Sequence, residues 1–321
     1  MFFELVRPGT RFDFLARRRL WAGLSIGALA ICALAIPLRG VRLGVDFAGG
    51  TELQVRVRDR SADEGAVRGA LRAGGLPAAD VIRVGGGGES VFLVRLPLGA
   101  GDAESASAPV QRALAAGIGD VEIERVEFVG PRVGDDLRRG AFLSMAVAFA
   151  LIGVYMAFRF QLRFVPGALL AVVHDAALAA GAFVVLGLEL DLGVVAGLLT
   201  VVGYSLNDTI VIYDRIRENL AMRGAARFSE VVNASINQTL SRTLLTSGTT
   251  LLAALALLLL GGSEIFSFAL TMTIGIVVGT YSSIYVAAPL LLALYGEAGA
   301  ARPARREAAH HGSGAGRADR A

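Results

Sequence analysis

A carboxylate occurs inside an apolar stretch that is long enough to cross a membrane. Asp208 lies in residues 193–213, which read GVVAGLLTVVGYSLNDTIVIY. A charged side chain at bilayer depth costs at least ~2.5 kcal/mol on insertion scales, so it requires a partner, a water path or a proton. Asp208 therefore predicts a site that handles protons or ions, although a hydrogen bond to a neighbouring helix would also account for it.

Other polar residues share one side of the helix that carries Asp208. At ~100° per residue, Thr200, Gly203, Tyr204, Asn207 and Asp208 fall within an arc of about 140°. A polar arc on an apolar helix is expected to face other protein rather than lipid. The pattern therefore predicts a buried polar seam along this helix.

A second candidate for chemistry is Arg242, which opens a later apolar stretch. Thr246 follows it on the same helical face, with Thr249, Thr250 and Ala253 beyond. Arg242 could be an anchor whose charged end reaches the membrane surface. The threonine face favours a polar seam instead, because Ser and Thr can form hydrogen bonds between membrane helices.

The pair His174-Asp175 lies within another apolar stretch. Neighbouring residues diverge by ~100° on a helix and cannot both face one partner squarely. We expect Asp175 to pair across helices while His174 faces water. A satisfied polar pair at a helix crossing and a functional site both remain open as interpretations.

The composition indicates a membrane protein. The 321 residues have a positive mean hydropathy, and none of the 31 basic residues is lysine. No basic cluster is interleaved with aromatic residues, so nucleic-acid binding is not expected. No GxxxxGK[ST] loop and no nucleophile–base grouping appears, so we expect neither an enzyme nor a cofactor. The single cysteine, Cys32, excludes an intramolecular disulfide, and His310-His311 is a weak basis for a metal site.

Six apolar stretches can each span ~30 Å of hydrocarbon, which takes about 20 residues. They are residues 20–38, 141–158, 166–187, 193–213, 243–261 and 265–295. The last is long enough to tilt or break. The first resembles a signal peptide, but its apolar run is longer than usual and favours an uncleaved anchor.

Arginines set the predicted orientation. They cluster before the first stretch, between the second and third, between the fourth and fifth, and in the tail. The positive-inside rule places these segments, and so both termini, in the cytoplasm of a multi-pass protein of the inner membrane. The predicted organisation is a cytoplasmic segment (1–19), a first membrane helix (20–38), an external domain (39–140), a five-helix membrane region (141–295) and a disordered cytoplasmic tail (296–321).

The external segment reads as a small α+β domain. Strands are predicted at 51–58, 81–84, 91–96 and 121–129, and helices at 62–73 and 103–116. Gly85-Gly-Gly-Gly88 is a plausible hairpin turn between the middle strands. The order β-α-β-β-α-β predicts a ferredoxin-like fold.

Several motifs together resemble a known family. They are GVDFAGGT (44–51), VGPRVG (129–134), VHD (173–175), GYSLNDTIVIYDRIREN (203–219) and NQTLSRT (237–243). The chain is similar to the SecD/SecF family of the bacterial Sec protein-export machinery. Phe47 after Asp46 and the single small external domain favour the SecF branch of that family.

The resemblance implies a six-helix membrane fold of the resistance-nodulation-division type. It implies a pseudo-symmetric pairing with SecD and assistance to the SecYEG channel, with the proton-motive force drawing unfolded polypeptides across the lipid bilayer. By motif position, Asp208 would handle protons, Arg242 would be its counterpart, and Asp175 would occupy a recurrent polar position. A small-molecule exporter of the same superfamily and a purely structural stabiliser of the translocon are the alternatives.

Overall fold

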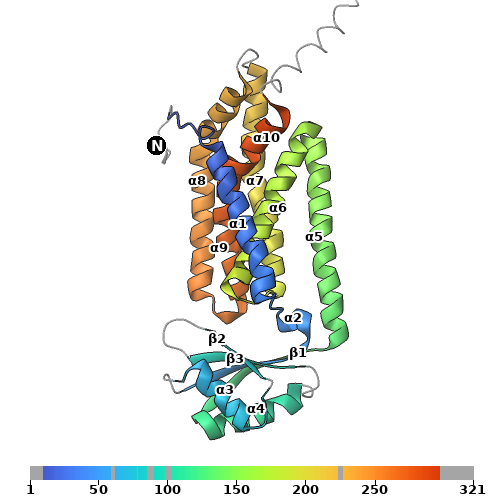
Figure 1. Ribbon diagram of the computed structural model, residues 1–321, viewed down its shortest axis with the longest axis vertical. Helices are drawn as coiled ribbons and strands as arrows, with labels where there is room; N and C mark the ends of the chain where they lie inside the picture. The colour runs from blue at the N-terminus through green and yellow to red at the C-terminus, as the bar shows by residue number, and fades with distance from the viewer. Residues whose placement is uncertain are drawn as a thin grey trace, which may run out of the picture.

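The structure is a computed structural model that describes residues 10–58, 62–77, 79–84, 90–97, 103–222 and 227–296. A bundle of long helices stands upright, and a small sheet domain lies across one end of it (Figure 1). Within the described residues, six helices are long and apolar enough to cross a membrane. Each of the six predicted spans falls on one of these helices, so the predicted multi-pass architecture is confirmed.

The first membrane helix precedes the sheet domain, and the others follow the domain one after another. The membrane helices are α1 (Arg18–Arg39), α5 (Pro131–Arg159), α6 (Val165–Leu186), α7 (Leu192–Met222), α8 (Phe228–Leu260), α9 (Phe266–Ser282) and α10 (Ala288–Tyr295). The 3₁₀ turn η1 (Leu162–Phe164) precedes α6, and η2 (Ser263–Ile265) precedes α9. A π-helical turn, η3 (Ser283–Ala287), joins α9 to α10 and makes them one span.

Two helices begin well before the apolar stretches that predicted them, and α7 ends well after its own. The helix α5 begins at Pro131 and α8 begins at Phe228, whereas their apolar stretches begin at 141 and 243. Hydropathy marks only the part of a helix within hydrocarbon, while its hydrogen bonding continues into polar surroundings. Proline suits the first turn of α5 because its fixed φ is preorganised there.

The last span is interrupted, as its length suggested. In the π turn η3 the backbone hydrogen-bond pattern shifts by one residue. The hydroxyl of Tyr213 on α7 donates to the carbonyl oxygen of Ala287 at 2.9 Å, so a side chain from another helix supports the irregular turn.

The sheet domain has the predicted element order. Its elements are β1 (Gly50–Val57), α3 (Glu64–Ala73), β2 (Asp80–Val84), β3 (Ser90–Leu96), α4 (Ala103–Ile118) and β4 (Val121–Val129). The strands lie in the order β2-β3-β1-β4 and every neighbouring pair is antiparallel. This is the ferredoxin-like arrangement. The predicted glycine turn between β2 and β3 lies outside the described residues.

A short helix that the sequence reading missed precedes the sheet. The helix α2 (Val45–Ala48) lies between α1 and β1 and packs against α5. Gly134 of α5 permits this approach, because a Cβ there would lie 3.2 Å from the carbonyl oxygen of Phe47.

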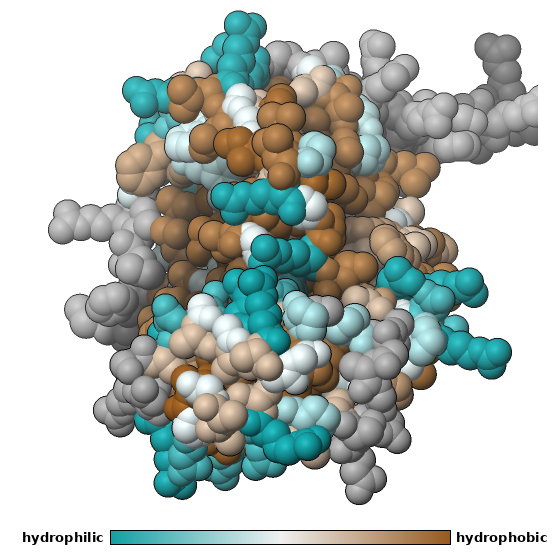
Figure 2. Space-filling view, turned by 60° about the horizontal axis from the view of Figure 1, so that its bottom comes forward, coloured by the Kyte–Doolittle hydropathy of each residue, from teal (hydrophilic) through white to brown (hydrophobic). Residues whose placement is uncertain are grey.

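The molecule has separate apolar cores. In the domain, α3 and α4 pack on one face of the sheet around Leu53, Phe92 and Leu114, and the other face looks toward the helix ends (Figure 1). Within the bundle, α6, α7 and the last span are deeply packed, whereas α1 and α5 leave most of their apolar side chains exposed. Figure 2 shows hydrophobic residues over much of the bundle surface and hydrophilic ones around the sheet domain and at the opposite end.

The start of α1 and the end of α10 lie at the end of the bundle that is opposite the sheet domain (Figure 1). This agrees with a topology in which both chain ends are on one side of the membrane and the domain is on the other. The predicted disordered tail lies outside the described residues, apart from Gly296.

Candidate ion-handling site

Asp208 is buried between α7 and α8. Its side chain is almost fully enclosed, with 2% of the residue exposed. The hydroxyl of Ser247, on α8, donates to Oδ2 of Asp208 at 3.0 Å. This is the only hydrogen bond to the carboxyl group found among the described residues. Asp208 therefore keeps acceptor positions that a proton can occupy.

Arg242 lies near Asp208 without contacting it directly. Its charge is close enough to act electrostatically on the carboxyl group. Within the described part of the chain, no ion pair within 4.0 Å joins the two residues, and Arg242 is exposed at the bundle surface. The two residues are thus near each other without a direct ion pair.

The predicted seam is only partly buried, which corrects the expectation for two of its members. Thr200 and Asn207 are exposed, whereas Tyr204 is half-buried and Asp208 is buried. A helical wheel identifies residues that share a face, but it does not say which side of that face neighbouring helices cover. The exposed residues form a polar strip on the outer surface of α7.

The threonines satisfy their hydroxyl groups within their own helices. Thr200 donates to the carbonyl oxygen of Ala196 at 2.8 Å, and Thr246 donates to that of Arg242 at 3.0 Å. Thr246 is half-buried and makes no hydrogen bond to another helix in the described structure. The expected threonine seam therefore does not link helices within this chain.

Asp175 forms a second, fully enclosed polar cluster. It is 0% exposed and lies where α6, α7 and α9 meet. Oδ2 accepts hydrogen bonds from Ser205 on α7 and, at 2.6 Å, from Ser282 on α9. The expectation that Asp175 pairs across helices agrees with this geometry.

His174 does not face water as expected. It is 7% exposed, and its Nδ1 lies 2.8 Å from Oδ1 of Asp175. Two adjacent side chains can bend toward each other even though their backbone directions diverge by ~100° on a helix. Nε2 of His174 is buried and has no hydrogen-bond partner among the described residues.

Small residues bring α7 and α9 close enough to build this cluster. A Cβ on Gly279 would lie 3.0 Å from Cβ of Ser205, and one on Gly197 would lie 2.7 Å from Cβ of Thr271. Gly275 and Gly279 form the GxxxG pair of the last span, which is a packing motif. Close approach of the backbones allows the short serine side chains to reach Asp175.

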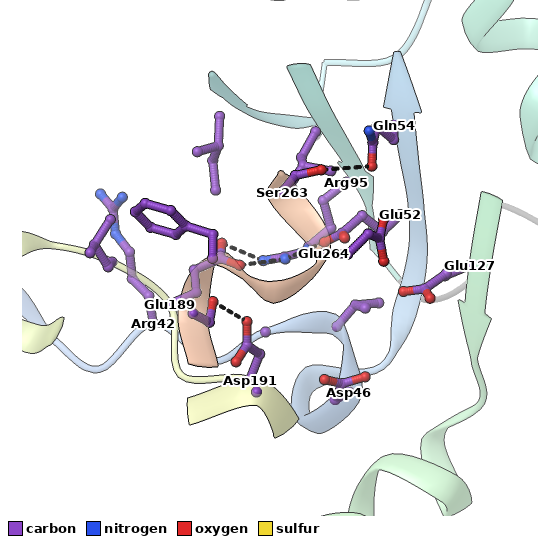
Figure 3. A pocket seen from close by; sticks show the side chains of 18 of the residues that line it. Arg42, Asp46, Glu52, Gln54, Arg95, Glu127, Glu189, Asp191, Ser263 and Glu264 are labelled. Carbon is purple, nitrogen blue, oxygen red and sulfur yellow. Dashed lines mark hydrogen bonds and ion pairs between the residues drawn. The ribbon is translucent and has the colours of Figure 1, made fainter. Parts of the chain in front are cut away.

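The sequence reading missed a polar junction between the sheet domain and the helix ends. Arg95 on β3 contacts Glu52 on β1 at 2.5 Å and also pairs with Glu189 in the α6–α7 loop (Figure 3). Arg125 on β4 pairs with Glu264 in η2. No local motif signals these pairs, because each joins residues that are far apart in the sequence.

The junction encloses a cavity of about 510 Å³ lined by both charge signs. Burial raises the pKa of Glu189, and the hydrogen bond and charge of Arg95 offset this only in part. Burial also raises the pKa of Asp191, against the opposing hydrogen bond from Ser267 at 2.6 Å. Both carboxyl groups therefore hold a proton more readily than exposed ones do. Among the described residues, no group of three or more His, Cys, Asp or Glu side chains is arranged to hold a metal ion.

Comparison with known proteins identifies the family. Residues 110–297 match the family described as protein export membrane protein SecD/SecF, C-terminal, and residues 34–59 match the SecD/SecF GG motif. The chain belongs to the SecD/SecF family. The first match includes Asp175, Asp208 and Arg242, and the second includes α2 and all of β1.

Relatives extend over most of the chain. It is 40% identical to protein translocase subunit SecF of Vibrio alginolyticus, over 91% of this chain and 92% of that protein. It is 43% identical to the subunit of the same name of Magnetococcus marinus, over 90% of this chain and 94% of the relative. Protein translocase subunit SecDF of Thermus thermophilus is 40% identical over 90% of this chain, which spans only 39% of that longer protein.

Solved structures agree with the fold. The crystal structure of SecDF from Thermus thermophilus, a translocon-associated membrane protein, matches 89% of this chain with a TM-score of 0.81 and 40% identity. A SecDF structure in a super-membrane-facing form matches 97% of this chain with a TM-score of 0.66 and 39% identity. This chain covers 39% and 41% of those chains. The predicted fold class is therefore confirmed.

Proposed function

We propose that this chain is the SecF subunit of a Sec protein translocase. With a SecD subunit it uses the proton-motive force to promote export of unfolded proteins through the SecYEG channel. It lies in the cytoplasmic (inner) membrane with both termini in the cytoplasm and the sheet domain outside. Its similarity to SecF-named relatives over nine-tenths of both chains supports this assignment.

The observation that carries proton coupling is the sparse hydrogen bonding of the buried Asp208. Its carboxyl group is buried yet receives one hydrogen bond, from Ser247. A buried carboxyl group that is not held by several donors changes protonation state when its surroundings change. The exposed Arg242 supplies the variable part of those surroundings, because its distance from Asp208 depends on how α7 and α8 sit.

The partner surface in this proposal is the polar strip on α7 together with Arg242. Thr200 and Asn207 lie on the surface of a helix that crosses the bilayer. Lipid is a poor neighbour for an amide side chain, and a polar helix face is better covered by protein. SecDF relatives carry a longer chain than this one, and a separate SecD subunit would supply the corresponding cover.

Two other functions fit less well. A small-molecule exporter of the same superfamily is opposed by the SecF and SecDF names of the relatives over most of this chain. A purely structural stabiliser would not require a membrane carboxyl group that is held by a single hydroxyl. Its proposed role is that of a transport subunit rather than an enzyme.

The test replaces Asp208 by Asn, which keeps the shape and the contact with Ser247 but cannot titrate. We expect Asp208→Asn to co-purify with SecD at the normal level and to lose the stimulation of export by the proton-motive force. Asp214→Asn is the matched control, because Asp214 lies on the same helix but is half-exposed and pairs with Arg217 at 2.8 Å. Full stimulated export by Asp208→Asn at normal protein levels would show that Asp208 has only a packing role.

A further inference from the structure

The uncovered face of the sheet lies over the outer ends of the membrane helices. Helices α3 and α4 pack on the opposite face, so the domain rests on the bundle through polar strand residues (Figure 1). The contacts come from two places on the bundle, which are the α6–α7 loop and the turn η2 between α8 and α9. These loops join the helices that carry Asp175, Asp208 and Ser247.

The first contact is centred on Arg95. Its guanidinium group is shared between Glu52 of its own sheet and Glu189 of the α6–α7 loop (Figure 3). The three side chains are 14–16% exposed, so this contact is largely shielded from solvent. If the domain separates from the loop, Arg95 still keeps Glu52 as its partner.

The second contact repeats this arrangement on β4. Arg125 is shared between Glu127 of its own strand and Glu264 of η2. These side chains are 35–51% exposed, and an exposed ion pair contributes only about 0–1 kcal/mol. Between the two contacts, Ser263 of η2 donates a 3.4 Å hydrogen bond to Gln54.

No apolar core joins the two parts among the described residues. The core of the domain contains only domain residues, and the core of the bundle contains only residues outside the sheet domain. A cavity of about 510 Å³ lies between them. Domains that meet through small, polar interfaces are expected to move relative to each other.

The chain also provides a place to bend. Gly49, which ends α2, and Gly50, which begins β1, have φ values of 72° and 128°, which few residues with a Cβ adopt. On the bundle side of this pair, the amide of Gly44 donates to the carbonyl oxygen of Leu190 at 2.7 Å, and that of Leu192 donates to Asp46 at 2.9 Å. The helix α2 is therefore fixed to the bundle, so bending between α2 and the sheet would fall at these two glycines.

We propose that Arg95 and Arg125, with Glu189 and Glu264, form a reversible latch that docks the sheet domain on the membrane bundle and releases it during the transport cycle. When the domain is released, each arginine loses its carboxylate on the bundle but keeps its carboxylate within the sheet. Neither guanidinium group is left without a partner. Movement of α6–α7 or α8–α9 shifts one latch carboxylate away from its arginine and frees the domain. The role in the cycle rests on the proposed export function, whereas the docking itself does not.

The experiment links the two parts across the latch. Cysteines replace Gln54 and Ser263 in a Cys32→Ala background, and a short, reducible bis-methanethiosulfonate reagent joins them. The matched control joins cysteines at Arg56 and Glu122, which oppose each other on β1 and β4 within the domain. Linkage is followed on gels, and export is compared before linking, after linking and after reduction.

We expect the Gln54–Ser263 link to abolish stimulated export and reduction to restore it, with no loss on linking Arg56 to Glu122. We also expect Arg95→Gln together with Arg125→Gln to slow linking across the latch several-fold, but not linking in the control pair. Unchanged export after complete linking would show that the domain stays docked throughout. An unchanged linking rate in the double variant would show that the arginines do not hold it. The linking rate is independent of export, so it separates failure of the latch from failure of the proposed function.

Discussion

The two buried carboxylates of the bundle are held in contrasting ways. Asp175 receives hydrogen bonds from Ser205 and Ser282 and contacts His174, so α6, α7 and α9 all support it. Asp208 receives one hydrogen bond, from Ser247 on α8. Asp175 thus has several hydrogen-bond partners from this chain, whereas Asp208 has one such partner and lies near the exposed Arg242.

The number of hydrogen bonds distinguishes a packing role for Asp175 from the proposed proton-binding role of Asp208 more clearly than burial does. Both carboxylates are almost fully buried, and depth in the membrane alone suggests the same role for each. A carboxylate that accepts several hydrogen bonds from neighbouring helices loses them when it moves, so it resists displacement. A carboxylate with a single donor loses little, and it is therefore the better place for a proton to bind and leave.

The largest expected effect is the loss of stability from removing the carboxylate of Asp175. Asp175→Ala deprives two serines and a histidine of their partner. Hydrogen bonds between membrane helices are worth ~0.6–1.7 kcal/mol each, so the free energy of unfolding should fall by about 2–4 kcal/mol. Asp208→Ala removes one such bond and should cost about 1 kcal/mol or less. Both free energies of unfolding can be measured by adding a denaturing detergent to protein in a mild detergent. Equal losses for the two variants would show that the two carboxylates do not differ in how they are held.

A smaller effect is expected at Arg242, measured on stimulated export. Arg242→Ala removes the charge near Asp208 and should reduce stimulation several-fold. Arg242→Lys keeps the charge but loses the planar guanidinium group, so its effect should be milder. Arg215→Ala is the control, because Arg215 is a half-buried arginine of α7 that pairs with Glu218. An equal loss in the Lys and Ala variants would show that the guanidinium geometry, rather than charge, matters.

The smallest expected effect concerns Glu189 and Asp191, the carboxyl groups at the junction between the sheet domain and the bundle. They are less deeply buried than Asp175 and Asp208. Burial raises the pKa values of Glu189 and Asp191 in the docked structure. Nearby carboxylates act in the same direction, and they are Glu52 and Asp80 for Glu189 and Asp46 for Asp191. A raised pKa means that the docked form binds the proton more tightly than the released form does.

Docking should therefore strengthen as the outer side becomes acidic, since a protonated Glu189 can still accept a hydrogen bond from Arg95 through its carbonyl oxygen. The contribution is fully present below the ordinary carboxyl pKa of about 4 and is lost as pH rises through the raised values. The rate of linking Gln54→Cys to Ser263→Cys, divided by that of the Arg56–Glu122 control pair, should rise by about two-fold between pH 7.5 and 5. A ratio that falls with acid would mean that the charge on Glu189 favours docking.

The sequence predicted what depends on local pattern. Alternation and turn residues placed β4 at 121–129, where the structure has it, and hydropathy located all six spans. The carboxylates at 175 and 208 were found because charged residues are conspicuous in apolar helices. Helical starts at Pro131 and Phe228 were missed, since nothing in a hydropathy pattern marks where a membrane helix continues into water.

Relations between helices could not be predicted from one helix at a time. The exposure of Thr200 and Asn207 depends on which neighbours α7 has, and the burial of His174 depends on how α6 rotates against α9. The sharing of Arg95 between two glutamates depends on strand register together with a distant loop. Glu264 showed no role in the sequence because its partner, Arg125, is far away along the chain.

The segment before the first membrane helix is held by a helix that comes much later in the chain. The backbone amide of Phe12 donates to Asn237 at 2.8 Å, and that of Phe14 donates to Asn233 at 2.9 Å, both on α8. The side-chain amides of both asparagines also donate to the carbonyl oxygen of Phe12. Four membrane helices must therefore leave the ribosome before this segment meets its binding residues. The segment before α1 can therefore bind its asparagines only after α8, the fifth span, has been made.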